Sequence, residues 1–207
     1  INPDDMVNMY GADALRCYEM FMGDYEKEAA WNEQGLNGIY RFINRVYRAG
    51  EMINQEEGYT KELEQLLHKT IKKVTEDIDH MKFNTAVSSL MILLNKMEEI
   101  GSITKQDFRT YLLLFNPICP HVTEELNEMY GLGEALWKSA WPSYEEDKLV
   151  EREKTIAVQV NGKVRATITI SVDDEEDVIK EKALQEENVK RYIEGKEIVK
   201  TIVIKGR

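Results

Sequence analysis

Cysteine and histidine are scarce in this chain of 207 residues, which contains two cysteines and three histidines. Cys17 and Cys119 lie far apart in the sequence and neither belongs to a CxxC pair. This spacing excludes a disulfide-rich scaffold and, with no histidine at ligand spacing from either cysteine, predicts no metal site. We expect both cysteines to be reduced, buried thiols.

Long apolar runs are missing as well. None approaches the roughly 20 residues that a membrane-spanning helix needs, and the N-terminal INPDDMV has no basic segment followed by an apolar one, as a secretory signal would. We therefore expect a cytoplasmic protein without membrane contact, and the absence of a starting Met suggests a piece of a longer chain. No phosphate-binding glycine loop and no nucleophile elbow is present, so the residues alone predict no catalytic residue.

Charge is abundant but unevenly distributed. The formal net charge is −11, yet residues 151–207 contain 12 Lys and Arg against 12 Asp and Glu, so the whole acidic excess falls within residues 1–150. Such a shift in composition suggests a domain boundary near residue 150.

Residues 1–150 have the pattern of successive amphipathic helices. Asn2 and Pro3 are typical of a helix start, Gly11 interrupts the first helix, and Thr104 with Asp107 forms a capping-box pattern. Further helices are expected over residues 12–22, 32–53, 60–81, 84–100, from 104 to 117, and 121–130. Short connections between helices favour an antiparallel helix bundle.

The pattern of apolar and polar residues changes after residue 150. Residues 154–160 and 163–170 alternate between apolar and polar around Asn161-Gly162, which predicts a β-hairpin with a type I′ turn. A helix over residues 173–187 and a strand over residues 198–204 complete a small α/β domain. Within the second hairpin strand, strict alternation places the odd positions on a polar face and the even positions on the core (Lys163, Arg165, Thr167, Thr169 against Val164, Ala166, Ile168, Ile170).

Basic residues gather locally in spite of the acidic total. On spacing alone, ordinary solvated surface charge is the simpler interpretation. The alternative is a set of cationic patches that contact nucleic-acid phosphates while the acidic surface repels polyanions elsewhere. The candidate contacts are Arg41, Arg45, Arg48, Lys69, Lys72, Lys73, Lys163, Arg165, Lys196 and Lys200.

Several segments resemble a known family. NPDDMVNMYGADALRCYEMFMG (2–23), GIYRFINRVYR (38–48), FNTAVSSLM (83–91) and FNPICPHVTEELNEMYG (115–131) are similar to the C-terminal half of class I aminoacyl-tRNA synthetases of the leucyl, isoleucyl and valyl group. WPSYEEDKLVEREKTIAVQVNGKVRATI (141–168) and the closing EGKEIVKTIVIKGR resemble the bacterial leucyl-tRNA synthetases in particular. The resemblance covers essentially the whole chain.

The resemblance implies a mainly α fold with three parts: residues 1–24 as a connector from a catalytic core, residues 25–148 as a helical anticodon-binding domain, and residues 151–207 as a small tRNA-binding domain. It implies leucine tRNA and the remainder of the synthetase as partners, a monomer, and no catalysis by this portion. ATP and Mg would be used by a catalytic domain further upstream. The matching half of an isoleucyl or valyl enzyme, or a helical protein-interaction module, remains the alternative.

One position departs from the family pattern. The motif Glu124-Glu125-Leu126 is usually followed by Trp, whereas Asn127 follows it here. We expect Trp137 or Trp141 to fill the corresponding part of the core.

Overall fold

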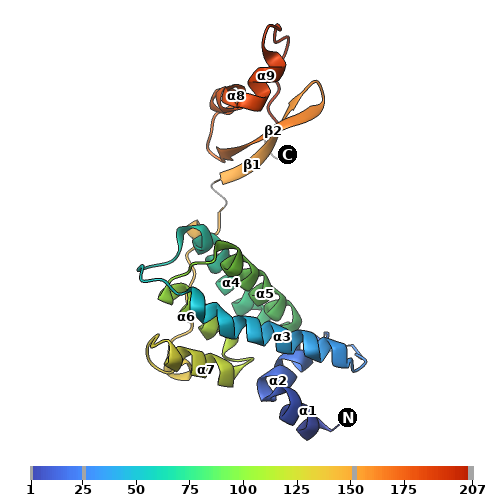
Figure 1. Cartoon of the computed structure of the whole chain (residues 1–207), viewed down its shortest axis with the longest axis vertical. Coiled ribbons are helices and arrows are strands. Elements are labelled where there is room, and N and C mark those ends of the chain that lie inside the picture. Colours follow the sequence, from blue (N-terminus) through green and yellow to red (C-terminus); the bar gives the residue numbers. More distant parts are fainter. Residues whose placement is uncertain (1, 25–26, 151–152, 205–207) are drawn as a thin grey trace. The chain divides into compact units, whose positions relative to one another are not determined.

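The structure is a computed structural model that describes residues 2–24, 27–150 and 153–204. It divides into two compact units, Ile1–Leu149 and Val150–Arg207. The first is a bundle of α-helices and the second is a small α/β unit built on a hairpin (Figure 1). The predicted fold class is confirmed. None of the helices in the described ranges is long and apolar enough to cross a membrane.

The helical unit contains seven α-helices within its described residues. They are α1 Pro3–Tyr10, α2 Ala12–Phe21, α3 Glu33–Ala49, α4 Lys61–Asp79, α5 Phe83–Ile100, α6 Lys105–Phe115 and α7 Pro120–Met129, with 3-10 turns at Gly50–Met52, Leu136–Lys138 and Glu146–Lys148. Asn2 and Asn32 cap the first turns of α1 and α3 through their side-chain oxygens. Thr104 and Asp107 form the predicted capping box of α6.

Helix α3 ends earlier than the sequence predicts. The amphipathic pattern extends to Ile53, but the α-helix stops at Ala49 and tightens into a 3-10 turn at Gly50–Met52. The Tyr130 ring lies against Gly50 so closely that a Cβ atom there would be 2.1 Å from Tyr130 Cε2. Only glycine fits at this contact, which joins the end of α3 to the end of α7.

The core of the helical unit draws on every helix, including those of the predicted connector. Ala14, Cys17 and Tyr18 of α2 are buried in the same cluster as Leu67 and Phe108. Residues 2–24 therefore pack as part of the helical unit. Cys17 and Cys119 are both buried and free, in agreement with the sequence. Burial, and a hydrogen bond with the Cys17 thiol, raise the pKa of Cys119, so this thiol is protonated at neutral pH.

The expectation that a tryptophan replaces the family's missing aromatic residue is wrong. Trp137 is 71% exposed and Trp141 is 39% exposed. Asn127 is instead buried in a polar network, accepting a hydrogen bond from Arg109 Nη1 at 2.6 Å and donating to the Glu134 carbonyl at 3.0 Å. A satisfied polar network thus occupies the position after the Glu-Glu-Leu motif.

The C-terminal unit begins with the predicted hairpin. Strands β1 Glu153–Val160 and β2 Lys163–Ser171 pair antiparallel. Asn161 and Gly162 have φ values of 52° and 76°, as a type I′ turn requires. Helices α8 Glu176–Gln185 and α9 Glu187–Ile193 follow. The small core contains Ile156, Ile168, Ile170 and Ile179.

The helix expected over residues 173–187 is present as α8, with narrower bounds, and the further helix α9, which was not foreseen, follows after the extended Glu186. One expectation for this unit is wrong. Residues 198–204 are not a strand, since the described sheet consists of β1 and β2 alone. In this segment Val199 is 94% and Ile202 is 67% exposed, and Val203 packs against the small core. A run of β-branched residues favours a strand but does not supply the neighbouring strand to which it must hydrogen-bond.

Candidate nucleic-acid interface

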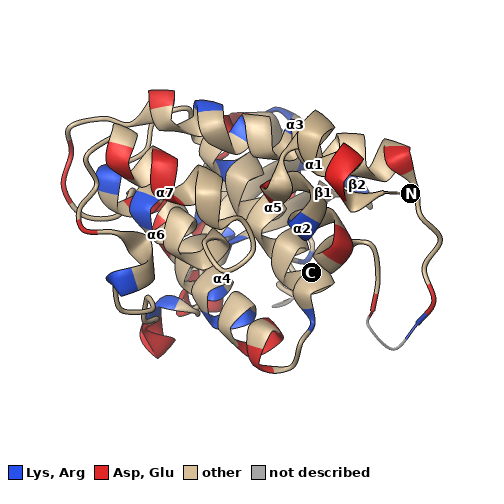
Figure 2. Cartoon of the chain, turned by 90° about the horizontal axis from the view of Figure 1, so that it is seen from below, with Lys and Arg blue, Asp and Glu red and all other residues tan. Residues whose placement is uncertain are grey.

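The candidate cations of the helical unit lie on α3 and α4. Acidic and basic residues are interspersed over the helices rather than separated into one wholly basic face (Figure 2). The cations must therefore be considered individually, by what each one contacts.

The arginine stripe of α3 contains two kinds of residue. Arg41 and Arg48 are exposed. Arg45 instead joins α3 to α5, donating from Nε to Glu98 Oε1 at 3.0 Å and from Nη2 to Asn95 Oδ1 at 2.5 Å. The hydrogen bond to Glu98 raises the pKa of Arg45. Part of the Arg45 charge is thus compensated within the fold, whereas Arg41 and Arg48 present theirs to solvent.

The candidate lysines of α4 have partners on the chain. Lys72 lies 3.4 Å from Glu146 Oε1 and 5.4 Å from the centre of the Tyr144 ring. Lys73 forms an ion pair with the buried Asp77, and Lys69 is half-buried on the same helix. These contacts compensate much of the charge that the sequence suggested for a phosphate site.

A segment that we call the strap, residues 141–148, runs along α4 and explains the partners of Lys72. Trp141 Nε1 donates to Thr75 Oγ1 at 2.8 Å near one end of the strap. The Glu145 amide donates to His68 Nδ1 at 3.1 Å in the middle of the strap. Lys148 pairs with Glu64 at 3.0 Å near its other end. The strap was not predicted, because each of its contacts joins residues more than sixty positions apart.

The predicted strict alternation of β2 is wrong at the end of the strand that carries Lys163 and Arg165. Val158 pairs with Ala166 but Gln159 pairs with Val164, so Arg165 is an extra residue on β2, a β-bulge. Residues directly opposite in an antiparallel pair share a face. Beyond the bulge the alternation is therefore reversed: Val164 is 57% exposed instead of lying in the core.

The bulge directs Arg165 toward α9. Its Cζ lies 3.7 Å from the centre of the Tyr192 ring, and its Nε is buried. Tyr192 was not among the predicted site residues. The available signal was an aromatic residue within a basic segment, Lys190-Arg191-Tyr192, although nothing local indicated which side chain it would meet.

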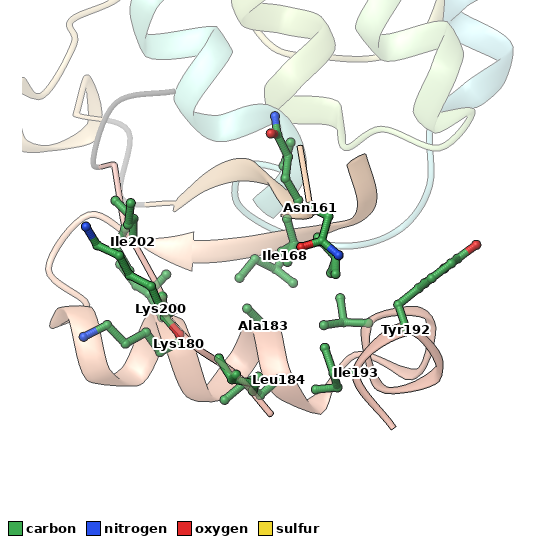
Figure 3. A pocket seen from close by; sticks show the side chains of 18 of the residues that line it. Asn161, Ile168, Lys180, Ala183, Leu184, Tyr192, Ile193, Lys200 and Ile202 are labelled. Carbon is green, nitrogen blue, oxygen red and sulfur yellow. The ribbon is translucent and has the colours of Figure 1, made fainter. Parts of the chain in front are cut away.

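A groove of about 850 Å³ separates the hairpin and helices from residues 196–204. Figure 3 shows Ile168, Ala183 and Ile193 directed into it, with Lys180 and Lys200 extending at one end and Tyr192 at the other. Lys196 also lines the groove and donates to the Tyr192 carbonyl at 3.1 Å. The predicted Lys196 and Lys200 thus both line this groove of the C-terminal unit.

In the part of the chain that the structure describes, no three His, Cys, Asp or Glu side chains are grouped so as to hold a metal ion. The candidate contacts for a polyanion are the exposed arginines of α3 and the cations and aromatic ring of the C-terminal unit.

Comparison with known proteins identifies the family. Residues 60–180 match the family described as "Anticodon-binding domain of tRNA ligase". This match crosses the boundary between the two compact units, and we take the packing as the better guide to that boundary.

Two similar relatives are leucine–tRNA ligases. The chain is 45% identical to that of Alkaliphilus oremlandii (strain OhILAs) over 207 residues and 46% identical to that of Elusimicrobium minutum (strain Pei191) over 209 residues. All of this chain is covered in both, but it spans only 26% and 25% of their lengths.

A solved structure has the same fold. The crystal structure of the ternary complex of Agrobacterium radiobacter K84 agnB2 LeuRS-tRNA-LeuAMS matches 99% of this chain and 29% of its own chain, with a TM-score of 0.69 and 24% identity. With the family match extending over more than half of the residues, the chain belongs to the anticodon-binding domain family of tRNA ligases.

Proposed function

We propose that this chain is the tRNA-binding portion of a leucine–tRNA ligase. It holds leucine tRNA while a catalytic portion elsewhere in the ligase attaches leucine. That catalytic portion uses ATP and Mg, and we assign no residue of this chain to binding either of them. The observation that carries the proposal is identity of 45–46% with leucine–tRNA ligases along the whole chain. That identity includes the C-terminal unit beyond residue 180, where the family match ends, and it favours a leucyl over an isoleucyl or valyl enzyme.

Binding proceeds by contacts to phosphate and sugar that position the tRNA body. A chain with a net charge of −11 cannot attract RNA by total charge, so local cations must supply the attraction. Recognition of folded RNA through shape and exposed loops suits this arrangement. Holding the tRNA body places its reactive end, because binding energy far from the chemistry contributes to positioning.

The proposal includes three further points. The chain acts as a monomeric portion of its ligase, it works in the cytoplasm where translation occurs, and by itself it does not aminoacylate. Its partners are leucine tRNA and the remainder of the ligase chain.

Discrimination between tRNAs tests the proposal. We expect the 207-residue chain to bind a leucine tRNA transcript more tightly than a valine tRNA transcript in parallel titrations at one salt concentration. Tighter binding of the valine transcript would favour the valyl alternative. No binding of either transcript would leave the helical protein-interaction module as the better account.

The α3 arginines provide a sharper prediction. Replacing Arg41 and Arg48 together by Ala should weaken binding of the leucine transcript and flatten its salt dependence, since each lost phosphate contact removes about 0.7–0.9 from the slope of log K against log salt. The matched control is Arg45→Ala, which removes the same side chain from the same helix. Because Arg45 is engaged by Glu98, it should change the slope less. Equal slopes for the parent and the double variant would remove α3 from the interface.

A further inference from the structure

Arg165 has no paired residue on strand β1, whereas Val164 and Ala166 on either side of it do. The pairs Val158–Ala166 and Gln159–Val164 close on either side of it. A β-bulge re-aims a side chain at the cost of ladder pairing. In a hairpin of this length, that cost suggests that the direction of the Arg165 side chain matters.

The side chain is held by an aromatic ring rather than by an acid. At 3.7 Å from the Tyr192 ring centre, Arg165 Cζ is in van der Waals contact with the face of the ring. Nε is buried and, among the described residues, has no hydrogen-bond acceptor. A buried donor without an acceptor is rare in native proteins and calls for an explanation, such as a ligand that completes the site.

Two lysines of α8 are instead paired with acidic residues. Lys180 pairs with Asp177 at 3.1 Å, and Lys182 pairs with Asp174 at 2.6 Å. Their charges are compensated on the chain itself. Arg165 is thus oriented by its contact with Tyr192, and its Nε donor has no acceptor among the described residues.

We propose that Arg165 and Tyr192 form a stacking platform for one unpaired nucleobase of the bound RNA. The inference rests on the proposed function and adds a binding site to it. Unpaired RNA bases stack on aromatic rings and on guanidinium planes. Tyr192 is 41% exposed, so part of the pair is accessible to a base that would extend the stack. The guanidinium then donates to the acceptors of that nucleotide.

A base explains the geometry better than a phosphate alone. A phosphate is bound through positive charge and hydrogen-bond donors, which a guanidinium supplies without help from a neighbouring ring. It gains nothing from a tyrosine ring beneath the cation. The stacked pair is planar, and a planar ligand makes use of both components.

Conservative variants of the whole chain test this platform in titrations with the leucine tRNA transcript. Arg165→Lys and Tyr192→Leu should each weaken binding about 5- to 150-fold, the range measured for loss of one stacked base. Tyr192→Phe should bind like the parent. Arg165→Lys should keep the salt slope because the charge remains. The double variant should be little worse than either single variant, because the two residues act as one unit.

Arg191→Lys is the matched control: it makes the same change at an exposed arginine beside Tyr192 and should leave affinity unchanged. Ultraviolet crosslinking of the parent complex followed by peptide mass spectrometry should place a nucleobase on Tyr192. Parent-like affinity of Arg165→Lys or of Tyr192→Leu, or crosslinks only elsewhere, would overturn the platform. If the parent chain itself fails to bind the leucine transcript, the proposed function fails with it, which is a distinct result.

Discussion

Replacing Asp107 by Ala is expected to lower the free energy of unfolding of the helical unit by about 3–5 kcal/mol, because three donors lose their acceptor and each buried unsatisfied donor costs about 1–3 kcal/mol. The carboxylate is fully buried and accepts hydrogen bonds from two segments. Its Oδ2 accepts from the Thr104 amide at 2.9 Å and from the Thr60 hydroxyl at 2.6 Å, and Oδ1 accepts from the Thr60 amide at 3.1 Å. One side chain therefore ties the start of α4 to the start of α6.

Urea unfolding followed by circular dichroism measures this effect. Asp107→Asn is the informative control, because it keeps the volume and one acceptor oxygen and should cost less. Glu99→Ala, at an exposed position of α5, should change stability by less than about 0.5 kcal/mol. A loss below about 1 kcal/mol for Asp107→Ala would show that the shared cap does not hold the two helices together.

Asp13→Ala has the second largest expected effect, a loss of about 2–4 kcal/mol, because it leaves donors unsatisfied at a helix start. Asp13 of α2 lies at the first turn of α7, where Oδ2 accepts from the Val122 amide at 2.7 Å and Oδ1 contacts His121 Nδ1 at 2.8 Å. It is 8% exposed. A predicted connector residue thus caps a helix more than a hundred positions away.

His121→Ala separates the two contacts of Asp13 in the same unfolding assay. The His121 side chain is 75% exposed, so its pairing with Asp13 should contribute less than about 1 kcal/mol. The backbone capping of α7 should account for the rest of the Asp13 effect. Equal losses for the two variants would assign the effect to the imidazole instead.

Helix starts and tight turns were predictable from the sequence where neighbouring residues determine them. The capping box of Thr104 and Asp107 and the type I′ turn at Asn161-Gly162 involve residues within a few positions, and both formed as expected. The second role of Asp107, as acceptor for Thr60, depends on a distant segment. The sequence pattern contained no information about that contact.

The candidate site was less predictable for the same reason. Spacing placed Arg41, Arg45 and Arg48 on one side of a helix, but the pairing of Arg45 with Glu98 depends on how α3 packs against α5. The hairpin alternation was right at Ile168 and wrong at Val164, because a single bulged residue reverses every face beyond it. Whether these residues contact tRNA stays a prediction.

The salt dependence of RNA binding tests the central claim most directly. We propose that an acidic chain binds leucine tRNA through a few local cations, so the dissociation constant should be measured over a series of salt concentrations. The account predicts that log K falls linearly with log salt, with a slope of about −0.7 to −0.9 for each phosphate contacted. Affinity that does not change with salt, or no binding to the leucine transcript at low salt, would contradict it.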